Sequence, residues 1–141
     1  MATLKKYDEA IFETIKENPL PKVPKIEDIG TCWIENILFE NINTFSELIE
    51  KSVLSNTKEI TLYSFSSRNL LEFYKRTTYL FNEHIAEKII NLSYKEILNL
   101  LDSSNFFKKF INTLERKGYS TDLLYNSFMD MKNVDLIIYL R

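Results

Sequence analysis

Three polar residues have a type and a position suited to contacting a ligand, namely Asp28, Ser66 and Asn69. Asp28 ends a short stretch, 25–28, that we predict as a strand, and Ser66 and Asn69 follow a strand predicted at 58–65. Open α/β proteins bind ligands beyond the carboxyl ends of their strands. Asp28 could be a metal ligand or the cap of a turn or helix. Ser66 and Asn69 could contact a ligand or cap the helix that follows them.

The other residues with reactive or metal-binding side chains are isolated. His84 is the only histidine and no cysteine lies near it in the sequence, so we expect a surface position rather than a metal site. Cys32 is the only cysteine, and we expect a buried structural thiol because no catalytic partner is evident. Gly30 and Gly118 are the only glycines, which argues against a glycine-rich phosphate loop.

Aromatic residues are frequent, and core packing is their ordinary role. Phe106, Phe107 and Phe110 recur at helical spacing, which is typical of a helix face in a core and would also suit a binding groove or a tunnel for a prenyl chain. Trp33 and Tyr63 are expected to be core or partly buried aromatics rather than groups that stack on a substrate.

The composition indicates a packed core and excludes several classes of partner. Hydrophobic residues make up 45% of the chain, which predicts a packed core. The length of 141 residues predicts a single domain over 1–141. The formal net charge is −2 and no basic block occurs, so the electrostatic signature of nucleic-acid binding is missing. No apolar run approaches the roughly 20 residues of a transmembrane segment. The single cysteine and the lack of an N-terminal signal segment favour a cytoplasmic location.

In the first half of the chain, apolar spacing predicts two helices and one strand. The first 18 residues carry apolar side chains three and four positions apart, which predicts an amphipathic helix. Prolines at 19, 21 and 24 predict an extended linker. After the strand at 25–28 and a loop at 29–32, a helix is predicted over 33–54. Thr44 could cap a new helical segment at a break near 41–44.

In the second half, helices alternate with two strong strands. The predicted elements are a strand at 58–65, a helix at 69–90, helical structure to about 117 with a break near 102–105, a stop at Gly118, a short helix at 120–129 and a strand at 134–140. The last strand is largely apolar rather than alternating, as expected for a strand covered on both faces. The alternation predicts an α/β fold, with helices packed on a small parallel sheet.

Three segments, in matching order, resemble motifs of the cis-prenyltransferases, the undecaprenyl and dehydrodolichyl diphosphate synthases. Residues 15–22 and 26–33 are similar to the family's proline-containing lead-in, first strand and Asp-Gly-Asn-x-Arg loop, with Asp28 at the aspartate. Residues 60–69 read Ile-Thr-Leu-Tyr-Ser-Phe-Ser-Ser-Arg-Asn and resemble Leu-Thr-Leu-Tyr-Ala-Phe-Ser-x-Glu-Asn. Residues 134–138 resemble the strand before the last motif, whereas residues 85–118 match poorly. The resemblance therefore implies a shortened cis-prenyltransferase-like fold.

The resemblance also implies ligand contacts. The first-motif aspartate of the family holds Mg²⁺ beside a substrate diphosphate, and this role would fall to Asp28. Ser66 and Asn69 match polar positions of the second motif and would contact the same ligand. Mg²⁺ is the only cofactor that the resemblance implies, and only if a diphosphate site survives at Asp28.

Most of the positive charge that the family uses is replaced. The family's Gly-Asn-x-Arg falls on residues 29–32, which carry no cation, and Glu72 stands where the family has Arg. Burying a diphosphate without paired cations is very costly, so we expect the isolated chain to lack prenyltransferase activity. The resemblance then implies a degenerate, non-catalytic accessory subunit with a protein partner, such as a catalytic prenyltransferase subunit.

Two other functions stay open on the sequence. The helix-rich middle also suits a small protein–protein interaction factor unrelated to the family. The third alternative is a minimal polyprenyl diphosphate synthase whose missing residues come from a partner chain.

Overall fold

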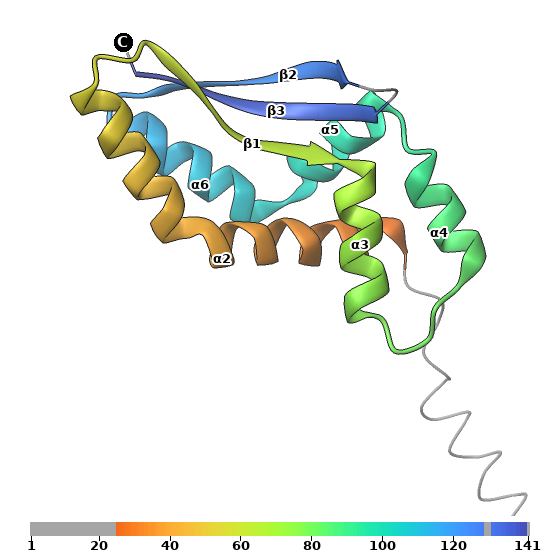
Figure 1. Cartoon of the computed structure of the whole chain (residues 1–141). Helices are drawn as coiled ribbons and strands as arrows, with labels where there is room; N and C mark the ends of the chain where they lie inside the picture. Colours follow the sequence, from red (N-terminus) through yellow and green to blue (C-terminus); the bar gives the residue numbers. More distant parts are fainter. Residues whose placement is uncertain (1–24, 129–130, 141) are drawn as a thin grey trace, which may run out of the picture.

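The computed structural model describes residues 25–128 and 131–140 (Figure 1). The helix predicted in the first 18 residues and the proline linker lie outside these residues. The elements in chain order are α2 (Ile26–Leu54), β1 (Glu59–Ser66), α3 (Ser67–Thr77), α4 (Glu83–Ile90), α5 (Tyr94–Ser103), α6 (Asn105–Arg116), β2 (Ser120–Phe128) and β3 (Met131–Tyr139).

The three strands form one antiparallel sheet in the order β1-β3-β2 (Figure 1). The central strand β3 pairs with β1, where Phe65 lies opposite Val134, and with β2, where Leu123 lies opposite Leu136. The predicted parallel sheet is therefore wrong. Only two residues separate β2 from β3, and so short a link joins antiparallel neighbours, whereas parallel neighbours need a crossover of a dozen or more residues.

The strands predicted at 58–65 and 134–140 are confirmed as β1 and β3. Residues 134–138 are all buried, and side chains of alternate residues face opposite sides of the sheet. Val134, Leu136 and Ile138 belong to the core under the helices. Asp135 is buried on the other face, where it accepts hydrogen bonds from Ser64 Oγ at 2.7 Å and Asn126 Nδ2 at 3.0 Å.

Residues 26–54 form one continuous helix, so the strand predicted at 25–28, the loop at 29–32 and the break at 41–44 are wrong. Gly30 is buried where α2 crosses α5, and an added Cβ would lie 2.7 Å from Leu100 Cδ2. Its missing side chain thus permits close approach of two helices instead of marking a loop. Asn41 lies inside the helix, and its Nδ2 donates to the Ile37 carbonyl one turn earlier at 2.8 Å.

Residues 120–128 form strand β2, where the sequence predicts a short helix. Their pairing with β3 is in register along the whole strand, from Ser120 opposite Tyr139 to Phe128 opposite Met131. β-propensity depends strongly on the neighbouring strand. The hairpin with the strongly apolar β3 therefore outweighs the helical preference of this segment.

The long helix predicted at 69–90 is two helices, α3 and α4, joined by residues 78–82. Asn82 begins α4 because its Oδ1 accepts from the backbone N–H of His84 and Ile85 at 2.9 and 3.2 Å. The break predicted near 102–105 is confirmed at Ser104, which ends α5 and caps α6. The helical stop at Gly118 is confirmed by its φ of 94°, in the left-handed region that favours glycine.

The helices cover one face of the sheet (Figure 1). Phe65 of β1 is fully buried in the core that they form with it. Its ring contacts Trp33 of α2 at 5.7 Å and Phe107 of α6 at 5.9 Å between ring centroids, both edge-to-face. Trp33, predicted as a core aromatic, is buried. Within the described residues, no helix is both long and apolar enough to cross a membrane.

We expect Gly30→Val to lower the free energy of unfolding by about 1–3 kcal/mol, because the new side chain overpacks the contact with Leu100. Urea unfolding followed by circular dichroism measures this loss. Leu100→Ala in the same chain makes room for the valine, so the double variant should lose less than the sum of the two single variants. Additive losses would show that α2 and α5 do not meet at Gly30.

Candidate functional site

Ser66 acts as the N-cap of α3 in this structure. Its Oγ accepts a hydrogen bond from the backbone N–H of Asn69 at 3.1 Å, and the residue is buried. This is the capping alternative that the sequence left open beside ligand contact. A serine at this position satisfies a backbone N–H that would otherwise lack a partner in the first helical turn.

Asn69, in the first turn of α3, adds side-chain hydrogen bonds at the same corner. Its Nδ2 donates to the Ser64 carbonyl at 3.3 Å, and its side chain hydrogen-bonds the Tyr63 hydroxyl. Burial raises the pKa of Tyr63 above its ordinary value, while the bond to Asn69 opposes that shift and the negative charges of Glu40 and Glu72 add to it. Tyr63 is half-buried, as predicted.

Asp28 lies apart from this corner in the structure. It is exposed in the first turn of α2, where an acidic side chain favours the helix dipole. Asn69 lines a cavity between α2, β1 and α3 that does not include Asp28. Among the described residues, no group of three or more His, Cys, Asp or Glu side chains could hold a metal ion. The three predicted ligand residues therefore do not line a common cavity.

The cavity beside Asn69 has a volume of about 310 Å³ and a mixed polar lining. We name it the Tyr63 cavity; its polar lining residues are Asn36, Glu40, Asn41, Tyr63, Asn69, Glu72 and Arg76. Two carboxylates face one guanidinium in this lining. An excess of negative charge disfavours a diphosphate in this cavity.

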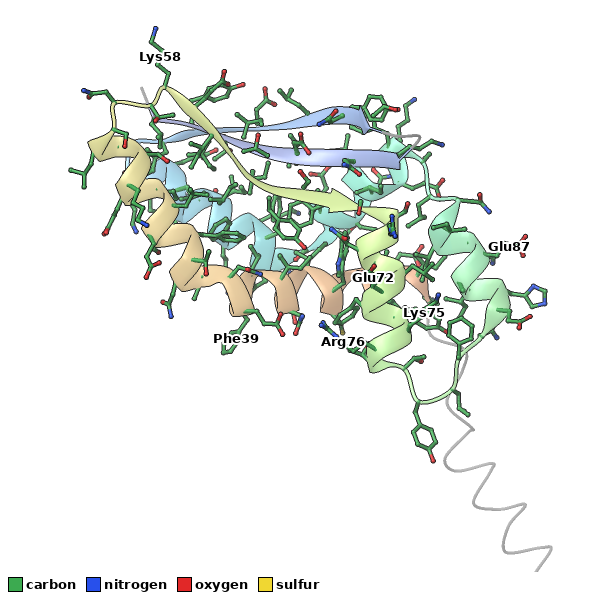
Figure 2. All side chains as sticks on the ribbon, viewed as in Figure 1. Phe39, Lys58, Glu72, Lys75, Arg76 and Glu87 are labelled. Atoms are coloured by element: carbon green, nitrogen blue, oxygen red, sulfur yellow. The ribbon has the colours of Figure 1, made fainter. Side chains whose placement is uncertain are left out.

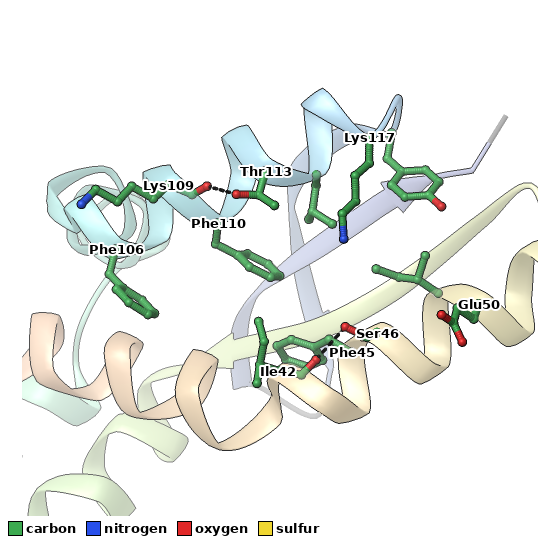
Figure 3. A pocket seen from close by; sticks show the side chains of 12 residues that line it. Ile42, Phe45, Ser46, Glu50, Phe106, Lys109, Phe110, Thr113 and Lys117 are labelled. Carbon is green, nitrogen blue, oxygen red and sulfur yellow. Dashed lines mark hydrogen bonds between the residues drawn. The ribbon is translucent and has the colours of Figure 1, made fainter.

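The larger cavity, about 420 Å³, is a groove between the second half of α2 and α6 (Figure 3). We name it the α2–α6 groove. The α2 wall consists of Ile42, Phe45, Ser46, Ile49 and Glu50, and the α6 wall consists of Phe106, Lys109, Phe110, Thr113, Leu114 and Lys117, with Tyr119 beyond them. Both walls recur at spacings of three and four, so each presents one continuous helix face.

Aromatic rings close the floor of the α2–α6 groove and charges lie on its walls. Phe45 and Phe110 meet across the floor with ring centroids 6.1 Å apart. The hydroxyls of Ser46 and Thr113 donate to helix carbonyls at 3.0 and 2.9 Å (Figure 3). Because both hydroxyl hydrogens are engaged in bonds to the helix backbone, the charged side chains are the strong polar groups of the walls. Figure 3 shows Lys117 reaching from α6 into the groove.

Sequence reasoning pointed toward this groove only through the phenylalanines of α6. Phe107 is buried in the core, whereas Phe110 is half-buried and Phe106 is exposed in the groove wall. Core packing is thus confirmed for Phe107, whereas Phe106 and Phe110 line a groove, and a role of that groove in binding stays a prediction. The α2 wall gave no separate signal, because its apolar residues resemble any buried helix face.

The structure confirms the predicted position of the histidine and contradicts that of the cysteine. His84 is exposed, as expected for a surface position. Cys32 is also exposed, so the predicted buried thiol is wrong. It lies on the solvent side of α2, opposite the buried neighbours Trp33 and Ile34.

Comparison with known proteins adds no relative to this description. No family model matches the sequence. No curated protein is significantly similar to it. No solved structure matches it significantly. The resemblance to cis-prenyltransferases therefore stays a prediction.

We expect Ser66→Ala to lower the free energy of unfolding by about 1 kcal/mol, because the first turn of α3 loses its cap. Asp28→Asn should lower it by only about 0.3–1 kcal/mol, the worth of an exposed charge near a helix N-terminus. Thermal and urea unfolding measure both. An Asp28→Asn loss several times larger would indicate a partner for Asp28 that this geometry lacks.

We expect the protein to lose stability as the pH rises above about 10, the ordinary pKa of tyrosine, partly through Tyr63. The folded state keeps the Tyr63 proton at pH values where the unfolded chain releases it, so alkali favours unfolding. The Tyr63→Phe variant has no hydroxyl to ionise at this position. Its free energy of unfolding, measured with urea, should therefore fall less between neutral and alkaline pH. Identical slopes for the two proteins would contradict the burial of Tyr63.

Proposed function

We propose that this protein is a non-catalytic interaction protein that holds an acidic amphipathic helix of a partner protein in the α2–α6 groove. The observation that carries the proposal is that each wall of the groove is one continuous helix face. Amphipathic helices bind such grooves through apolar residues at helical spacing.

The length of the walls supports a helical occupant. The α6 wall extends from Phe106 to Lys117, the C-cap residue of α6, which corresponds to about 17 Å at 1.5 Å per residue. A partner helix of three turns has this length. Ridges of side chains three and four residues apart are the surface into which another helix packs.

The apolar surface also continues beyond the cavity, which supports a helix over a small ligand. Ile42 and Phe106 are 45% and 43% exposed at the groove edge. Phe39, nearly one turn before Ile42 on α2, is also exposed. A ligand confined to about 420 Å³ would leave this surface in water, whereas a helix can cover it.

The charges of the groove predict the sign of the partner. Lys109 and Lys117 lie two turns apart on the α6 wall, and Glu50 lies on the α2 wall. The cations exceed the anions, so acidic residues on the flank that faces α6 would be favoured. Such rim charges contribute more to orientation and association rate than to affinity.

The family resemblance suggests which partner to try first, a catalytic prenyltransferase subunit. We propose this partner as the specific form of the same function. Mixing the two chains should then raise polyprenyl synthesis, and Ile42→Ser should weaken the increase. A rise that is insensitive to the groove variant would assign the subunit contact to another surface.

The proposal is tested by panning a displayed library of helical peptides, with leucines at helical spacing and randomised flanks, against the full chain. We expect enrichment of Asp and Glu on one flank. Ile42→Ser and Phe106→Ser should each weaken a selected peptide about tenfold or more, as expected when a hot-spot side chain is truncated. Lys117→Glu should also weaken it, and a Glu→Lys change in the peptide should restore binding.

The matched control is Ile90→Ser, since Ile90 is 46% exposed but lies at the end of α4, outside the groove. It should leave the affinity within about twofold, a difference of less than 0.5 kcal/mol. Selected peptides that bind the groove variants as well as the parent chain overturn the proposal. Dodecyl phosphate is the small-molecule probe: groove binding by it without enrichment of any helical peptide overturns the proposal as well.

A further inference from the structure

The loop between α3 and α4, residues 78–82, presents apolar side chains to solvent. Tyr79 is 98% exposed, Leu80 is 74% exposed and Phe81 is half exposed. Figure 1 shows this loop projecting from the body on the side away from the sheet. Three consecutive large apolar residues on a projecting loop are unusual for a surface that meets only water.

The loop is held in place from both ends. The Tyr74 hydroxyl accepts a hydrogen bond from the backbone N–H of Asn82 at 3.0 Å, and the Tyr74 ring lies 5.6 Å from the Phe81 ring. The backbone N–H of Thr78 donates to the Tyr74 carbonyl at 2.9 Å. These contacts fix the two ends of the loop while Tyr79 and Leu80 stay outside the core. The apolar tip is therefore preorganised, which lowers the entropic cost of binding.

Positive charge lies directly behind the tip. Residues 77–82 carry no charge, and Lys75 and Arg76 form the last turn of α3 just before them (Figure 2). The first turn of α4 carries Glu83 beside His84. One helical turn is about 5.4 Å, so the two cations sit about one turn behind the tip. Apolar groups of peripheral proteins enter a membrane interface by about 5–10 Å.

We propose that the 78–82 loop is a membrane-docking tip, with Tyr79 and Leu80 entering the interface of an anionic bilayer and Lys75 meeting its phosphates. Tyrosine suits this region because its ring is apolar and its hydroxyl is polar. A projecting tip can enter a bilayer without a complementary pocket. The uncharged tip matches the apolar layer of the bilayer, and the positive charge behind the tip matches its charged headgroup layer. The proposal is independent of the α2–α6 groove.

The test is co-sedimentation of the full chain with vesicles of phosphatidylcholine, with and without phosphatidylserine. We expect binding to the mixed vesicles that weakens with added salt. Leu80→Ser should lower the partition coefficient about tenfold, and Lys75→Glu should lower it at least fivefold. The matched controls are Leu54→Ser, 85% exposed at the far end of α2, and Lys58→Glu, at the opposite end of the molecule from Lys75 (Figure 2). Both should stay within about twofold.

A second measurement reports insertion directly. Trp33 is the only tryptophan and is buried, so it contributes a constant background to Leu80→Trp and Leu54→Trp. Only the Leu80→Trp emission should shift to shorter wavelength on adding the mixed vesicles. Equal sedimentation of all variants, or no spectral shift at position 80, overturns the proposal. Failure of both vesicle types to bind the parent chain also overturns it and leaves the loop as a protein contact.

Discussion

The edge-to-face contacts of Phe65 determine how the helices lie on the sheet. This fully buried ring joins Trp33 of α2 and Phe107 of α6 to the same strand, and each such pair adds about 0.5–1.5 kcal/mol to the burial of its surface. Because both helices are tied to the inner face of β1, they run beside each other over the sheet. Farther along α2, Phe45 and Phe110 meet only at the floor, and the α2–α6 groove opens above them.

The same packing gives structural roles to the residues that the sequence singled out for chemistry. Where β1 turns into α3, Ser66 caps the helix and Asn69 bonds both the Ser64 carbonyl and the Tyr63 hydroxyl. Asp28 stands alone in an exposed helical turn. A strand that runs directly into a helix needs these hydrogen bonds for its own backbone, and the polar groups that satisfy it are then less available to a ligand.

The proposed activities therefore depend on surfaces rather than on reactive groups. The α2–α6 groove has apolar walls with lysines at the rim, and the 78–82 loop has an apolar tip with cations behind it. These surfaces belong to different elements, so a partner helix and a bilayer could be held at the same time. A protein of this kind would act by bringing a helix-bearing partner to an anionic membrane.

Local sequence determined β1, β3, the break at Ser104 and the stop at Gly118. Each depends on only a few neighbouring residues: β-branched and aromatic residues favour the strands, a serine caps α6, and a glycine adopts the positive φ at the helix end. The helical spacing of Phe106, Phe107 and Phe110 likewise indicated a face. Tertiary structure alone decided that β2 is a strand, that Gly30 lies inside a helix and that the sheet is antiparallel. It also decided which phenylalanines line the groove. These outcomes depend on β3 and Leu100 as neighbours, and contacts between distant segments have no local signature in the chain.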